Sequence, residues 1–106
     1  MRILLVDDSR AVAAVIGARL EVIGHKVTVA ENGEVALARF QEALPDLVLM
    51  DIEMPVMNGF EAAQRIRALE ATQDWAWTPI IFLTASDTPE NLVTAIEAGE
   101  IGRAHV

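Results

Sequence analysis

The sequence has 106 residues, of which 53% are hydrophobic, and a formal net charge of −8 at pH 7. This length fits one domain with one hydrophobic core, and the apolar content is too high for an intrinsically disordered chain. Because the charge is strongly negative, we expect no direct contact with the phosphate backbone of a nucleic acid. The chain contains no cysteine, which excludes disulfide bonds, thiolate metal sites and cysteine nucleophiles.

The apolar run near the amino terminus is too short for a signal peptide or a membrane span. It covers Ile3 to Val6 and is followed at once by two aspartates, whereas a spanning helix needs about 20 apolar residues. No other stretch of the sequence approaches that length. We therefore expect a soluble, cytoplasmic protein that makes no contact with a membrane.

Residues 2–23 predict a strand followed by a helix. The run RILLV (2–6) is continuously apolar, which is typical of a strand buried on both faces. Ser9 can cap a helix over residues 10–23, and Gly24 suits the position after its last turn. Apolar residues recur along this helix at helical spacing: Val12, Val15, Ile16, Leu20 and Ile23.

A second and a third strand enclose the next helix. KVTVA (26–30) alternates like a strand with one polar face, and DLVLMD (46–51) is apolar almost throughout. Asn32 can cap the intervening helix, which we expect over about 33–43. Its predicted apolar stripe consists of Leu37, Phe40 and Leu44.

The loop IEMPVMNG contains a proline and an Asn-Gly pair, both of which favour turns. A third helix follows this loop. PIIFLT (79–84) predicts a fourth strand, with proline tolerated at its start, and Thr-Pro-Glu at 88–90 opens a fourth helix that ends at Gly99. The apolar positions that mark the third helix are Phe60, Ala63, Ile66 and Leu69.

Strands that alternate with helices in this way predict an α/β fold, in which helices cover both faces of a parallel sheet. Functional residues of such sheets lie beyond the carboxyl ends of the strands. Asp7 and Asp8 follow the first strand, Asp51 ends the third, and Thr84 ends the fourth. Any one of these acids could be a solvated loop residue or a helix cap, but together they predict a site.

Clustered carboxylates resist joint ionisation unless a cation neutralises them. An all-oxygen site without histidine or cysteine indicates Mg²⁺, which most often accompanies a phosphate. One carboxylate could itself be a nucleophile that forms an aspartyl phosphate. The metal would then offset charge on the transferred group, and the hydroxyl of Thr84 could bind one of its oxygens.

The motifs LLVDDS, DLVLMDIEMPVMNGFE, PIIFLTA and AIEAG together resemble the receiver domain of two-component response regulators. The resemblance covers residues 2–99 in unbroken order. It implies a flavodoxin-like, doubly wound parallel sheet whose strand order here is 2-1-3-4, because no fifth strand or fifth helix follows. It also implies a receiver of signals rather than an enzyme, with self-phosphorylation and self-dephosphorylation as its only reactions.

The resemblance assigns a role to each residue at the strand ends. Asp51 is the expected phosphoacceptor, and a sensor histidine kinase or a phosphotransfer protein is the expected donor. Mg²⁺ is expected on Asp7, Asp8, Asp51 and the backbone carbonyl of Glu53.

Two residues after the fourth strand complete this set. Thr84 matches the switch hydroxyl, and the backbone N–H of Ala85 would bind another phosphoryl oxygen. No further cofactor site is expected, and the full-length parent could carry a carboxyl-terminal output domain.

The sequence departs from the family after Gly99. The family's fifth strand carries a lysine that contacts the phosphoryl group, but the only lysine here is Lys26, at the start of the second strand. The missing fifth helix would lie beside the helix over 10–23 and leave part of its apolar stripe uncovered. We expect an incomplete receiver domain over 1–99 and a non-native tail over 100–106, because EIGRAHV can be encoded by GAGATCGGAAGAGCACACGTC, which resembles a sequencing adapter. The alternative is a genuine protein with a truncated receiver.

Two other functions stay open. The first is a phosphatase-like enzyme with an aspartate nucleophile, although such enzymes usually need a second aspartate where Glu53 stands. The second is an interaction module that works without phosphorylation, which the set of Asp7, Asp8, Asp51 and Thr84 argues against.

Overall fold

The computed structural model describes residues 1–52, 54, 57–73, 75 and 77–83. None of the helices in these ranges is long and apolar enough to cross a membrane. The described elements, in chain order, are β1 (Arg2–Val6), α1 (Arg10–Val22), β2 (Lys26–Ala30), α2 (Gly33–Glu42), β3 (Leu47–Asp51), α3 (Gly59–Gln73) and β4 (Ile80–Leu83).

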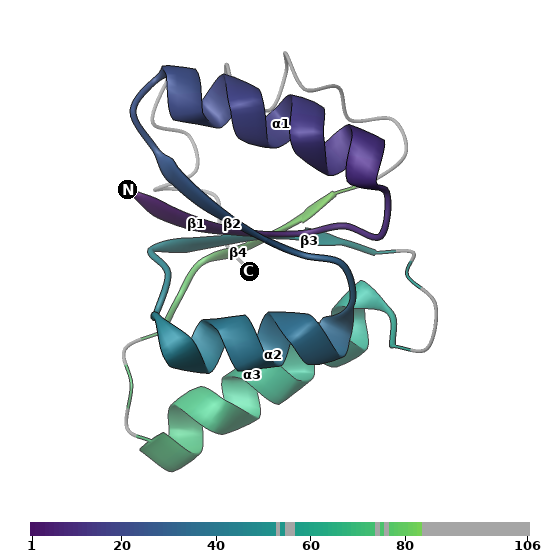
Figure 1. The fold of residues 1–106 in the computed structure, drawn as a ribbon. Helices are drawn as coiled ribbons and strands as arrows, with labels where there is room; N and C mark the ends of the chain where they lie inside the picture. Colours follow the sequence, from purple (N-terminus) through teal and green to yellow (C-terminus); the bar gives the residue numbers. More distant parts are fainter. Residues whose placement is uncertain (53, 55–56, 74, 76, 84–106) are drawn as a thin grey trace.

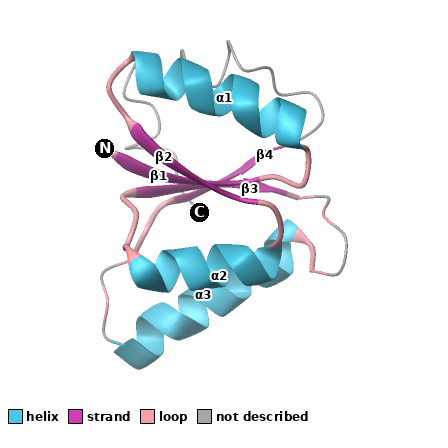
Figure 2. Ribbon diagram, viewed as in Figure 1, coloured by secondary structure: helices cyan, strands magenta, loops and turns pink. Residues whose placement is uncertain are grey.

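The four described strands form one parallel sheet in the order β2-β1-β3-β4. Helix α1 covers one face of the sheet, and α2 and α3 cover the other (Figures 1 and 2). The predicted doubly wound α/β fold and strand order are therefore confirmed. The predicted helix from 88 to Gly99 lies outside the described residues.

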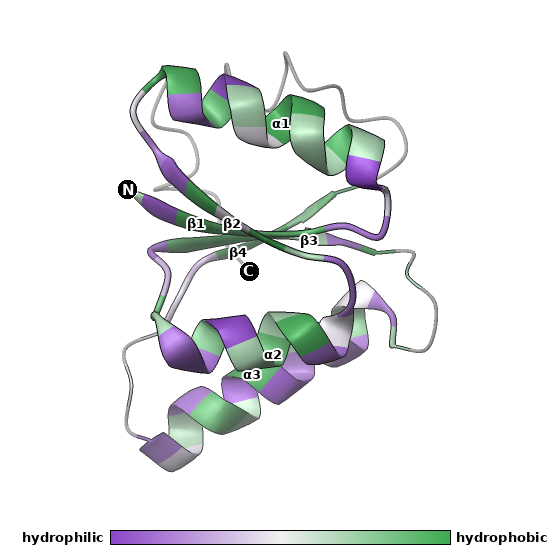
Figure 3. Cartoon of the chain, viewed as in Figure 1, coloured by the Kyte–Doolittle hydropathy of each residue, from purple (hydrophilic) through white to green (hydrophobic). Residues whose placement is uncertain are grey.

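Alternate side chains of the strands point to opposite faces and build two core layers. The layer under α1 contains Ile3, Leu5 and Leu49 from the sheet, and the layer under α2 and α3 contains Leu4 and Val48. Because both faces are covered, β1 is apolar from residue 3 to 6 and β3 from residue 47 to 50, the stretches that Figure 3 colours green.

The predicted helix caps are present. The hydroxyl oxygen of Ser9 accepts a hydrogen bond from the N–H of Val12, and the Asn32 side chain accepts one from the N–H of Val35. Gly24 has a φ of 98°, which favours glycine directly after a helix.

Some apolar positions differ from the predicted core. Leu44 is 41% exposed because α2 ends at Glu42, and Phe60 is 51% exposed with its ring against Phe82. Leu44 therefore lies beyond α2 and not on its apolar stripe, whereas Phe60 lies in α3, the helix that it was expected to mark. Val12 and Val15 are also exposed, by 43% and 46%, in line with the expected uncovered part of the α1 stripe.

An ion pair between buried Glu70 and partly buried Arg67 connects α3 to the residues just before β4. Glu70 is 5% exposed, and its carboxylate bonds to Arg67 at 2.7 Å and accepts the N–H of Thr78 at 2.7 Å. Arg67 also donates to the carbonyl of Thr78 and lies 4.1 Å from the ring centre of Trp77. This network fixes where β4 begins.

We expect Glu70→Ala to lower the free energy of unfolding by about 3 kcal/mol, because it leaves Arg67 and a backbone N–H without their buried partner. Arg39 and Glu42 form a matched ion pair, with the same residue types and spacing, on the exposed face of α2. Glu42→Ala should cost only about 0.5 kcal/mol. Urea denaturation measures both, and equal losses would contradict the structural role of Glu70.

Candidate functional site

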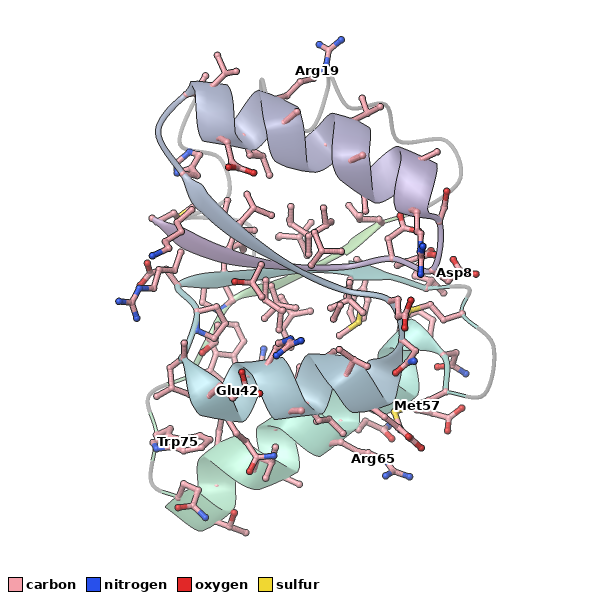
Figure 4. The ribbon with its side chains drawn as sticks, viewed as in Figure 1. Asp8, Arg19, Glu42, Met57, Arg65 and Trp75 are labelled. Carbon is pink, nitrogen blue, oxygen red and sulfur yellow. The ribbon has the colours of Figure 1, made fainter. Side chains whose placement is uncertain are left out.

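Three aspartates meet at the carboxyl edge of the sheet. One carboxylate oxygen from each of Asp7, Asp8 and Asp51 lies within 4.8 Å of the others. The register explains why: Val6 of β1 pairs with Met50 of β3, so the next residue of each strand reaches the same level. The expected convergence is therefore present for the three aspartates, and Figure 4 shows Asp8 at this end of the molecule.

Asp7 is the most enclosed of the three. It is 7% exposed, and its backbone N–H donates to the carbonyl of Ala30 at 3.0 Å. Burial raises the pKa of its carboxyl above the usual 3.8, and the neighbouring charge of Asp8 raises it further. The N–H of Ser9 donates to its Oδ1 at 2.8 Å and partly offsets this effect on the pKa.

The role of Ser9 at the site was missed from the sequence, where it was assigned only a capping role. An aspartate that accepts the N–H two residues later forms an Asx turn, and Asp-x-Ser after a strand is a recognisable signal for one. The turn orients the Asp7 side chain, and its last residue, Ser9, also caps the start of α1.

Asp51 is partly buried at the end of β3 and is held through its neighbours. The N–H of Ile52 donates to the carbonyl of Leu83 at 3.3 Å, and the N–H of Gly59 donates to the carbonyl of Ile52 at 2.9 Å. A Cβ at Gly59 would overlap the carbonyl oxygen of Asp51, so only glycine allows α3 to begin this close to β3.

Asn58 caps the start of α3. Its Oδ1 accepts the N–H of Glu61 at 3.0 Å, and its Nδ2 donates to the carboxylate of Glu61 at 3.0 Å. The Asn-Gly pair predicted as turn residues therefore ends the loop after Asp51 and begins the helix.

The other predicted site residues, Glu53, Thr84 and Ala85, lie outside the described residues. Their roles, and the individual roles of the three aspartates, stay predictions. The described part of the site is a compact set of carboxylates without nitrogen or sulfur ligands, which suits a hard divalent cation.

The sequence profile described as "Response regulator receiver domain" matches residues 3–102. The chain belongs to this family, as its resemblance predicted.

The chain spans very different shares of two curated relatives. It is 42% identical to the two-component response regulator ORR41 of Oryza sativa subsp. japonica, covering 93% of this chain and 77% of that protein. It is 37% identical to the gliding motility regulatory protein of Myxococcus xanthus, covering 93% of this chain but 12% of that protein.

Solved structures agree with the fold. The amino-terminal domain of a response regulator/sensory box/GGDEF 3-domain protein from Carboxydothermus hydrogenoformans has a TM-score of 0.79 at 30% identity, covering 92% of each chain. The solved complex of histidine kinase ThkA with response regulator protein TrrA matches with a TM-score of 0.69 at 39% identity, covering 82% of this chain and 71% of that chain.

The raised pKa of Asp7 predicts how stability depends on pH. Between pH 3.8 and the raised value, the folded state keeps a proton that the unfolded state has released, so stability falls as pH rises through this window. Above this pH window, ionised Asp7 lowers the free energy of unfolding by a constant amount. Asp7→Asn removes this cost and should make the chain more stable than wild type at pH 7 in a chelator.

Thermal melts of both forms from pH 3.5 to 7 test this prediction. The difference in stability between the two forms should vanish below about pH 3.8, where the Asp7 carboxyl is protonated in both the folded and the unfolded state. If the asparagine variant is the less stable one at pH 7 without divalent cations, burial does not raise the free energy of ionised Asp7.

Proposed function

We propose that Asp51 accepts a phosphoryl group from a phosphohistidine of a sensor histidine kinase or phosphotransfer protein, with Mg²⁺ bound beside it. The observation that carries the proposal is the cluster of Asp7, Asp8 and Asp51 within 4.8 Å. Membership of the receiver family and the similarity to a kinase-bound response regulator support it.

The reaction forms one bond and breaks one. A carboxylate oxygen of Asp51 attacks the phosphorus, an O–P bond forms, the N–P bond to the donor histidine breaks, and the imidazole leaves with the electron pair. Asp7 and Asp8 would hold Mg²⁺ together with Asp51, and a bound Mg²⁺ neutralises charge on the transferred oxygens. The predicted roles of Glu53, Thr84 and Ala85 complete this proposal.

Asp7 and Asp8 also bring negative charge close to Asp51. In the free chain the ionised carboxylates repel one another, and a bound cation would relieve that repulsion. The Ser9 N–H on Asp7 holds one of them in a fixed orientation. In this proposal a cation binds to the carboxylates before Asp51 accepts the phosphoryl group.

The same proposal covers the domain limits and the wider protein. We propose a receiver domain over 1–99, a non-native tail over 100–106, and an output domain in the parent protein. The family match reaches residue 102 and so overlaps the first residues of that tail. Re-amplifying the locus tests the tail: genomic DNA that encodes GRAHV after Ile101 would contradict it. The predicted cytoplasmic location stays a prediction.

Acetyl phosphate with Mg²⁺ should produce an acid-stable, base-labile adduct of one phosphoryl group on Asp51, located by mass spectrometry of peptides. Asp51→Asn should abolish it, since an amide is not a nucleophile for phosphorus. Asp46→Asn is the matched control, because Asp46 lies at the opposite edge of the sheet, where it accepts the N–H of Arg2. This variant should form the adduct as wild type does.

The assay should be run on the 106-residue chain and on a chain that ends as the re-amplified locus encodes. No adduct in either form would favour the interaction module that works without phosphorylation. Rapid turnover of diverse phosphoesters would favour the phosphatase-like enzyme.

A further inference from the structure

The junction between β2 and α2 contacts both parts of the acidic site. On one side, the carbonyl of Ala30, the last residue of β2, accepts the N–H of Asp7 at 3.0 Å. On the other side, Gly33, the first residue of α2, lies under Met57 from the segment that follows Asp51. Figure 4 shows Met57 at the same end of the molecule as Asp8.

Met57 fills the space that a side chain at position 33 would need. A Cβ placed on Gly33 would lie 2.6 Å from Sδ, 3.1 Å from Cγ and 3.2 Å from Cβ of Met57. Met57 is only 4% exposed and belongs to the core layer that contains Ala30 and Ala36. The absence of a side chain at Gly33 therefore allows Met57 to lie directly on the helix end.

Backbone hydrogen bonds connect this contact to Asp51. Met57 precedes the pair Asn58-Gly59, and the N–H of Gly59 closes back onto the carbonyl of Ile52, the residue after Asp51. A displacement of Met57 would therefore pull on the backbone next to the Asp51 carboxylate.

We propose that Met57 is a positioning residue for Asp51: seated on Gly33, it anchors the segment after Asp51 to α2 and so sets the placement of the carboxylate. This proposal rests on the phosphoacceptor function proposed above. Phosphoryl transfer depends almost entirely on positioning and charge, and a shift of about 1 Å can cost roughly 100-fold in rate. Residues that orient the ligands of a metal can also change its affinity by roughly 10- to 100-fold.

Gly33→Ala tests the proposal because it crowds Met57 without removing any group from the site. Alanine favours helix over glycine, so the chain should still fold. Gly17→Ala is the matched control: Gly17 is also a buried helical glycine, and a Cβ there would meet only Val27 Cγ1, at an ordinary 3.8 Å.

Three measurements follow from the crowding. The chain has four methionines, so ¹³C-methyl labelling resolves Met57, whose signal should shift in Gly33→Ala and not in Gly17→Ala. The rate of adduct formation with acetyl phosphate and the affinity for Mg²⁺, both at equal folded fraction, should each fall roughly tenfold in Gly33→Ala only.

The Met57→Ala background separates positioning from a general effect on folding. Without the methionine side chain nothing is left to crowd, so Gly33→Ala should change neither rate nor affinity further. The proposal is overturned if Gly33→Ala has the same effect in both backgrounds, or if it lowers stability while rate and Mg²⁺ affinity stay unchanged. A wild-type chain that forms no adduct would instead overturn the phosphoacceptor function.

Discussion

The parallel register between β1 and β3 is the constraint on which the site depends. The pairs Ile3 with Leu47 and Val6 with Met50 place the ends of both strands at one level. A slip by one residue would turn every side chain to the opposite face. Because both faces are buried under helices, such a slip would put Asp7 or Asp51 at a core position. Packing of apolar side chains therefore decides where the carboxylates lie.

That packing holds together groups that would otherwise separate. Asp7 is nearly buried, its pKa is raised by that burial, and Asp8 and Asp51 are close enough to share a cation with it. Such a cluster of carboxylates lowers the stability of the fold unless a cation binds to it. Destabilising clusters of this kind are typical of functional sites. Packing in the two core layers, one under α1 and one under α2 and α3, offsets the destabilisation by the carboxylates.

The elements were predictable because their signals are local. Continuous apolar runs identified β1 and β3, Ser9 and Asn32 identified helix starts, and the strand-end rule located the aspartates. Leu44 was placed on the stripe of the second helix because spacing alone does not show where a helix ends. The contact of Met57 with Gly33 was not predictable, since it joins segments distant in sequence and depends on an absent side chain.

The surroundings of Asp51 differ in how firmly they are held. Asp51 itself lies in the ladder between β3 and β4, and Ile52 still donates to Leu83. Met57, six residues further along the chain, lies against Gly33 of α2 through an unbranched, polarizable side chain rather than through a strand ladder. Charge added at Asp51 would therefore strain the sheet less readily than it would move the packing between Met57 and the start of α2. If Asp51 is phosphorylated as proposed, the register of the sheet would then stay intact while this contact moves.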